Sequence, residues 1–264
     1  MQVVGYDTAS ATLLLSHGVD DSGGDVESVA LDPGTELSWT LGDRHCAGTV
    51  YGHGSGDEGP EHIACDAPDA PYCPEHTSTW VCARCTGTCL KDEMDCYDDH
   101  AVYLAAFAPD AFKVGVTKAW RLDTRLREQG ADRGAHLYTV SNGRIARELE
   151  AEIAGGPESG LSDFVRVDTK RAGLGAGVDD DAWADLLAGF DVREQYTFDY
   201  GLDLTERPVA ETIATGTVRG TKGRLVVLDH AGSTYAVDLR DLVGYELREG
   251  GTGRDFQSSL GAFG

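Results

Sequence analysis

Side chains that could bind a metal ion are concentrated in one segment, residues 46–100. All seven cysteines of the chain lie in this segment, and five of the eight histidines lie in it or directly beside it. Thiolates and imidazoles are the ligands that Zn²⁺ prefers, and a Cys-x2-Cys pair such as Cys82 and Cys85 supplies two from one tight turn. A disulfide framework fits less well, because the number of cysteines is odd. The segment therefore predicts bound zinc.

These candidate ligands are more numerous than one tetrahedral site requires, so we expect one or two zinc ions. We expect one site to be formed by Cys82, Cys85, Cys89 and Cys96, and the other by Cys46, Cys65, Cys73 and His76. Whether His100 replaces one of these ligands stays open. Four protein ligands close a zinc site, so a structural role is expected. Because the segment ends at His100, directly before a predicted strand, we expect the metal segment to brace that strand.

The charge and composition of the 264 residues restrict the class of protein. The net charge is -23, with acidic residues spread along the chain and few lysines, which is typical of a hydrated acidic surface adapted to high salt. No run of about 18 apolar residues predicts a membrane-spanning helix. The first residues lack the basic region of a signal peptide, so we expect a cytoplasmic protein without a membrane partner.

Hydrophobic patterns and turn residues predict an α+β protein made of five segments. Residues 1–45 form an N-terminal β segment, residues 46–100 the Cys/His zinc-binding segment, and residues 101–156 a small α/β domain. Residues 157–250 begin with a helix and return to strands that suggest a small antiparallel β subdomain; residues 251–264 form a tail.

The predicted α/β domain has the clearest local signals. Apolar runs at 101–107 and 112–117 predict a hairpin. Residues 121–130 predict a helix that ends at Gly130, and 135–140 predict a third strand. Asn142 is a suitable N-cap for a helix over 143–156.

A basic island interrupts the acidic chain between Lys113 and Arg147. It contains eight basic and three acidic residues. An anionic partner such as a phosphate backbone would explain this excess of positive charge. The alternative is that the arginines form ion pairs with acidic residues on helix surfaces, and charge alone does not choose between the two.

Four short motifs occur in this region: VYL at 102–104, KVGVT at 113–117, TRLREQGA at 124–131 and ARELEAEI at 146–153. In this order they resemble the GIY-YIG nuclease domain, over about 55 residues. The wider pattern of a Cys/His cluster followed by these motifs resembles a family of uncharacterised zinc-binding proteins, and the chain looks like a member from salt-loving archaea.

The resemblance implies a role for each matching residue. Tyr103 would position or deprotonate the attacking water, Arg125 would stabilise the phosphate, and Glu150 would hold Mg²⁺ or Mn²⁺. Gly115 matches the glycine of the second motif, whereas Lys113 replaces its tyrosine and cannot copy the proton chemistry of a phenol. Helix geometry does not choose Glu150 over its acidic neighbours at 148 and 152. The implied nucleic-acid-binding residues are Lys113, Lys118, Arg121, Arg125 and Arg144.

Three functions compete on this basis. The first is a metal-dependent phosphodiesterase that acts on DNA or RNA. The second is a non-catalytic protein that binds nucleic acid or the ribosome, and the third is an interaction scaffold in which zinc only stabilises the chain. The basic island argues against the third function. Because Lys113 replaces the tyrosine of the nuclease motif, the sequence does not choose between the first two functions. The sequence does not indicate the oligomeric state.

Overall fold

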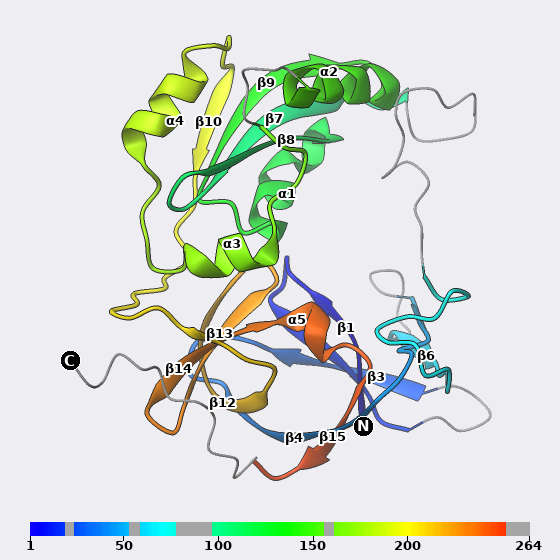
Figure 1. Ribbon diagram of the computed structural model, residues 1–264. Helices are drawn as coiled ribbons and strands as arrows, with labels where there is room; N and C mark the ends of the chain where they lie inside the picture. The colour runs from blue at the N-terminus through cyan, green and yellow to red at the C-terminus, as the bar shows by residue number, and fades with distance from the viewer. Residues whose placement is uncertain (19–23, 53–58, 78–96, 156–160, 252–264) are drawn as a thin grey trace. The chain divides into compact units, whose positions relative to one another are not determined.

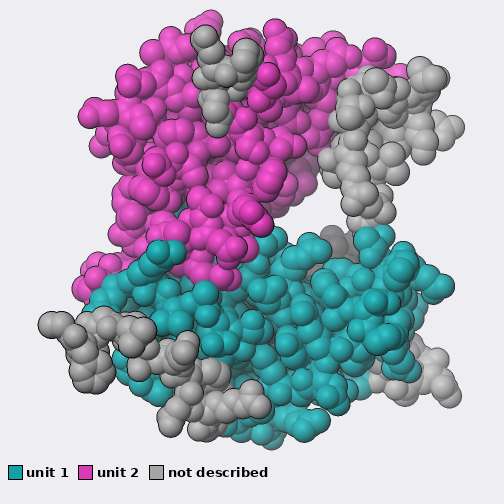
Figure 2. All heavy atoms as spheres, in the orientation of Figure 1, with its two compact units in different colours: residues 1–78, 206–264 teal, residues 79–205 magenta. Residues whose placement is uncertain are grey.

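The computed structural model describes residues 1–18, 24–52, 59–77, 97–155 and 161–251 (Figure 1). The chain divides into two units, coloured separately in Figure 2. Unit 1 consists of residues 1–78 and 206–264, and unit 2 of residues 79–205. Unit 2 is therefore an insertion in the sequence of unit 1.

Unit 1 is built on one large sheet. Its strands are β1 (Gln2–Asp7), β2 (Thr12–Ser16), β3 (Gly24–Ala30), β4 (Glu36–Arg44), β5 (Thr49–Tyr51), β6 (Glu61–Ile63), β11 (Val209–Ala210), β12 (Ala214–Lys222), β13 (Leu225–His230), β14 (Ser233–Asp238) and β15 (Tyr245–Glu249), with one helix, α5 (Leu239–Leu242). The strand order is β11-β14-β13-β12-β4-β15-β1-β2-β3-β6-β5. All neighbouring pairs are antiparallel except β11 and β14.

Strand β4 joins the N-terminal and C-terminal strands. It pairs with β12 on one side, where Ser38 lies opposite Thr215, and with β15 on the other, where Leu41 lies opposite Leu247. Strand β15 in turn pairs with β1. The two β segments that the sequence suggests as separate structures are therefore one sheet.

One core serves the whole of unit 1. Leu13 and Leu15 of β2 belong to the same cluster of buried residues as Tyr235 and Val237 of β14. These two strands lie far apart in the strand order. The sheet therefore curves, so that its apolar face encloses a common interior, as the alternation of side chains along each strand permits.

Unit 2 contains a four-stranded sheet and four α-helices. Its elements are β7 (His100–Phe107), β8 (Ala111–Lys118), the short 3-10 helix η3 (Ala119–Arg121), α1 (Leu122–Glu128), β9 (Arg133–Val140), α2 (Gly143–Gly155), α3 (Val167–Ala172), α4 (Asp180–Leu187) and β10 (Glu194–Thr197). The strand order is β10-β9-β7-β8. Within the described residues, none of the helices of either unit combines the length and apolar character needed to cross a membrane.

Strand β7 is the centre of unit 2. Every residue after His100 in this strand is buried. Val102 and Leu104 pack with α2 on one face of the sheet, whereas Tyr103 and its alternate neighbours pack with α1 on the other (Figure 1). This alternation explains why the strand is apolar along its whole length.

The local signals in unit 2 are confirmed. Strands β7 and β8 form the expected antiparallel hairpin. The Asn142 side chain accepts a hydrogen bond from the backbone N–H of Ile145 and so caps α2. At the end of α1, Gly130 has φ +69°, its N–H donates to Arg127 and the N–H of Ala131 donates to Leu126. This is the Schellman arrangement, which satisfies the last carbonyl groups of a helix.

The predicted fold class, an α+β protein with a small GIY-YIG-like α/β domain and a separate β subdomain, is wrong. The described residues are mostly β, with 42% strand and 19% helix, and their largest feature is the 11-stranded sheet. The sequence analysis treated strands as partners of their sequence neighbours. The unpaired N–H and C=O groups at a strand edge, however, can form hydrogen bonds with any strand that reaches them. Here β12 and β15, from the other end of the chain, pair with β4.

We expect Gly130→Ala to destabilise unit 2 by about 1 kcal/mol, because an alanine resists the left-handed conformation. Urea unfolding followed by circular dichroism would measure this loss. Gly177→Ala is the control, since Gly177 has no heavy atom within 4 Å of an added Cβ and its replacement should change stability by less than about 0.5 kcal/mol. Equal effects of the two substitutions would contradict the assigned helix end.

Candidate functional site

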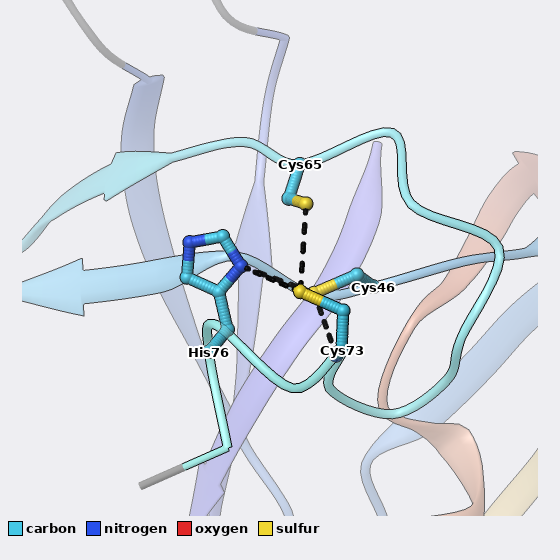
Figure 3. Close-up of side chains that lie close together, drawn as sticks. All are labelled: Cys46, Cys65, Cys73 and His76. Carbon is cyan, nitrogen blue, oxygen red and sulfur yellow. Dashed lines mark hydrogen bonds between the residues drawn. The ribbon is translucent and has the colours of Figure 1, made fainter.

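Four of the predicted zinc ligands lie together in unit 1. The sulfur atoms of Cys46, Cys65 and Cys73 and a ring nitrogen of His76 all lie within 4.8 Å of one another. Figure 3 shows the four side chains pointing toward a common centre. Cys46 and Cys73 are buried. This group could bind a metal such as zinc, and the predicted grouping of these four residues is confirmed.

The distances within the cluster fit a tetrahedral metal site. Around a zinc ion, two sulfur ligands lie about 3.8 Å apart, and a sulfur and a nitrogen about 3.5 Å apart. The structure has 4.0 Å between Cys65 Sγ and Cys73 Sγ. It has 3.5 Å from Cys46 Sγ to His76 Nδ1 and 3.2 Å from Cys73 Sγ to the same nitrogen. The side chains are therefore arranged for a metal without further rearrangement.

Backbone hydrogen bonds hold the loops that carry these ligands. Cys46 follows β4, and its N–H donates to the Ala67 carbonyl at 2.8 Å. The turn from Cys73 to His76 is closed by the His76 N–H, which donates to the Cys73 carbonyl at 3.0 Å. The Cys46 sulfur accepts from the N–H groups of Gly48 and Cys73. Such donors stabilise a thiolate, which is the metal-binding form of cysteine.

His62 supports the metal cluster and was not assigned a role in the sequence analysis. It is buried in β6, its Nε2–H donates to the Ala47 carbonyl at 2.9 Å, and its Nδ1 accepts from Ser16 Oγ at 2.8 Å. Burial lowers the pKa of His62. The ring is therefore a neutral link between the sheet and the residue next to Cys46.

The electrostatics around Cys73 favour a ligand role. Burial raises the pKa of the Cys73 thiol, but hydrogen bonds from the backbone and ring of His76 and from Cys46 outweigh burial and lower this pKa to about 7. A thiol with such a pKa gives up its proton to a metal readily near neutral pH.

The other predicted ligands, Cys82, Cys85, Cys89 and Cys96, lie outside the described residues. His100 begins β7 and its Nδ1 donates to the Asp98 carbonyl at 2.6 Å. The four clustered ligands belong to unit 1, whereas β7 belongs to unit 2. This cluster therefore holds the loops beside β4 and β6 of unit 1. The expected bracing of β7 by the metal segment stays a prediction.

A second group, here called the polar cluster, consists of Tyr103, Lys113, Arg125 and Glu150 of unit 2. Tyr103 is buried in β7, and its phenolic oxygen accepts a hydrogen bond from Gln129 Nε2 at 2.7 Å. Burial raises the pKa of Tyr103, Arg125 lowers it through charge and a hydrogen bond, and Glu150 raises it. Four residues from β7, β8, α1 and α2 thus lie within electrostatic range of one another.

The position of the Tyr103 ring depends on a glycine opposite it. Gly115 faces Tyr103 across the β7–β8 pair. A Cβ at position 115 would lie 2.6 Å from the ring and from the hydroxyl oxygen of Tyr103. Only glycine therefore lets the ring lie across β8.

Lys113 lies in a mixed electrostatic environment at the edge strand β8. Burial lowers its pKa to about 8, with Arg125 and Arg147 acting in the same direction and Glu150 and Asp163 opposing them. Its ammonium group is therefore mostly protonated at neutral pH, but it loses its proton at a lower pH than the ammonium group of an ordinary lysine.

Glu150 is distinguished from the neighbouring acidic residues by burial. It is 8% exposed and pairs with Arg147 at 2.7 Å. Glu148 and Glu152 are exposed, and Glu148 pairs with Arg144. Helix α2 therefore directs Glu150 toward the sheet.

The basic island is largely ion-paired. Seven of its eight basic residues have a carboxylate partner. The pairs are Lys118–Asp98, Arg121–Glu128, Arg125–Glu128, Arg127–Asp123, Arg133–Asp180, Arg144–Glu148 and Arg147–Glu150. Because Arg121 and Arg125 share one carboxylate, positive charge remains in excess beside α1.

Gln129 was missed by the sequence analysis. Its amide nitrogen positions the Tyr103 hydroxyl, while its Oε1 is buried without a hydrogen-bond partner in the described part of the chain. It is the C-cap residue of α1, before Gly130. The sequence marks that position as a helix end but gives no sign of the contact with Tyr103.

Comparison with protein families gives one match. Residues 75–247 match the family described as "Protein of unknown function (DUF2797)". The chain belongs to this family. Comparisons with curated proteins and with solved structures give no match. Because the description of the DUF2797 family states no function, the function has to be argued from the metal cluster and the polar cluster.

We expect His76→Ala to lower the bound metal by one equivalent, measured by mass spectrometry of purified protein. The melting temperature should fall by several degrees, because each 1 kcal/mol lost shifts it by about 2–4 °C in a chain of this size. A chelator should lower the melting temperature of the wild type toward that of the variant.

His17→Ala is the matched control, because His17 is an exposed histidine of the same unit, paired with Glu27. It should retain the metal content and melting temperature of the wild type. Unchanged metal content in His76→Ala would rule out His76 as a ligand.

Proposed function

We propose that the chain is a zinc-stabilised protein that binds nucleic acid through unit 2. The three thiols and one imidazole of the metal cluster are soft ligands at tetrahedral spacing, which favours Zn²⁺. Four protein ligands fill the tetrahedral positions around zinc and leave none for water or substrate, which favours a structural ion. A second zinc held by Cys82, Cys85, Cys89 and Cys96 remains part of this proposal.

The observation that carries the nucleic-acid proposal is the grouping of cations around Lys113. Burial lowers the pKa of Lys113 most, Arg125 and Arg147 act in the same direction, and Glu150 and Asp163 oppose them. A phosphate group placed there would favour the charged form of Lys113 and relieve the repulsion among the three cations. Arginine also offers the fork of N–H groups that suits phosphate oxygens.

The ion pairs of the basic island do not block this role. The side chains of Arg125 and Arg144 are 45% and 59% exposed, and exposed ion pairs contribute only about 0–1 kcal/mol. A phosphate can therefore replace their carboxylate partners at small cost. The acidic composition fits a protein adapted to high salt, in which such short-range contacts must provide the binding free energy.

We expect the affinity for a labelled oligonucleotide to fall as the pH rises from 7 to 9. Lys113 is protonated below its pKa of about 8 and loses its charge above it, whereas the arginines stay charged. Lys113→Arg should remove the pH dependence and retain the affinity. Lys113→Ala should weaken binding at pH 7 and reduce the dependence of log Kd on log salt by about 0.7. Fluorescence anisotropy would measure both.

Arg193→Ala is the control for charge, since it removes one exposed cation of unit 2 outside the basic island. Its affinity should match the wild type at each pH. If Lys113→Ala and Arg193→Ala weaken binding equally, general charge explains the binding and the proposed phosphate site does not.

Metal-dependent phosphodiester hydrolysis is the second candidate function, favoured by the contacts of Tyr103. Gln129 Nε2 donates to its phenolic oxygen, so the proton of the phenol is left for another partner such as a substrate oxygen. Glu150 would hold Mg²⁺ or Mn²⁺ near that oxygen, and the metal would offset charge on the leaving group. The motif resemblance to GIY-YIG nucleases assigns the same roles to these residues.

We expect that, if this second function holds, Glu150→Gln and Arg125→Ala lower the cleavage of labelled DNA or RNA about 100-fold or more in Mg²⁺ or Mn²⁺. Glu152→Gln is the matched control, because Glu152 is exposed on the same helix. Equal background cleavage by the wild type and all three variants would leave binding as the function of unit 2.

A further inference from the structure

Two large aromatic side chains of unit 2 are exposed beside the edge strand β8. Trp120 is 76% exposed and Phe164 is 62% exposed. Trp120 lies in η3, directly after β8. Tryptophan and phenylalanine usually bury most of their surface, so the exposure of both residues in unit 2 suggests a partner.

The two residues lie on the same edge of the sheet. Ser162 pairs in parallel with Lys113, and the Val114 N–H donates to the Ser162 carbonyl at 3.0 Å. Phe164 follows this bridge by two residues, and Trp120 follows the last residue of β8. The two aromatic residues are therefore close in the chain to opposite ends of the stretch from Lys113 to Trp120.

Cations accompany the aromatic rings. The Arg121 guanidinium lies 5.8 Å from the centre of the Trp120 ring, and Lys118 ends β8. Lys113 and Lys118 are five residues apart, which is about 17 Å along a strand, and an odd separation directs their side chains to opposite faces of the sheet. Lys113 and Arg121 are therefore the cations that this argument uses. Aromatic rings that alternate with cations along a groove or edge are typical of surfaces that bind single-stranded nucleic acid.

We propose that Trp120 and Phe164 stack on bases of a single-stranded nucleic acid whose phosphates lie along β8 and reach Lys113. This inference deepens the proposed function and rests on it. The flat face of a base is available to an aromatic side chain only in an unpaired strand, since a duplex presents base edges in its grooves. Stacking also suits a chain of net charge -23, because it does not depend on long-range attraction to phosphate.

The test separates bases from phosphates. Binding of a labelled oligothymidine strand is compared with binding of an abasic strand of the same length, by fluorescence anisotropy on the full zinc-loaded chain. Trp120→Ala should weaken binding of the thymidine strand about 5- to 150-fold and leave the abasic strand unaffected. Trp120→Phe should retain most of the affinity, and Phe164→Ala should act like Trp120→Ala.

Tyr51→Ala is the matched control, because Tyr51 is an aromatic of unit 1 that is 54% exposed; it should change neither affinity. Equal binding of the two strands by the wild type, an unchanged affinity in Trp120→Ala, or a preference for duplex would overturn the stacking surface. If in that case Lys113→Ala still weakens both strands, the proposed function stands alone. If the wild type binds neither strand, both proposals fail.

Discussion

The pairing of β4 with β12 and β15 is the constraint on which unit 1 depends. The Thr215 hydroxyl donates to the Trp39 carbonyl across 176 residues of sequence. Without these contacts, the N-terminal and C-terminal strands would each leave an unsatisfied edge and an open apolar face. Leu37 of β4 and Val218 of β12 are buried in the same core, so the hydrogen bonds and the apolar burial support each other.

The two functional clusters are stabilised in different ways. The metal cluster lies on short loops, where backbone hydrogen bonds and the buried ring of His62 determine the positions of the sulfur atoms. The polar cluster is fixed by a central strand that is buried on both faces, so the strand that carries its tyrosine cannot move without disturbing two cores. Metal ligation could therefore stabilise the region with few apolar residues, whereas ordinary sheet packing stabilises the polar cluster.

Much of the local structure could be predicted from the sequence. Gly130, Asn142 and the hairpin at β7 and β8 each follow from interactions between residues close in sequence, which a pattern records directly. The grouping of Cys46, Cys65, Cys73 and His76 follows from ligand chemistry. The continuous 11-stranded sheet, by contrast, could not be predicted, because strand periodicity specifies which face is buried but not which strand lies next to it.

The same limit applies to the candidate sites. The sequence indicates an excess of positive charge between Lys113 and Arg147, but the pairing of most of these residues with carboxylates depends on side-chain geometry. Gln129 contacts Tyr103 only because α1 ends where it does.

The metal cluster has a further consequence for the order of events in synthesis. Its four ligands lie within residues 46–76, whereas the strands that complete β4 begin at Ala214. Because the ribosome releases the chain from the N-terminus, a metal ion could bind while about half of the sheet has not yet been made. The loops it closes would then keep β4 and β6 together until the partners of β4 arrive.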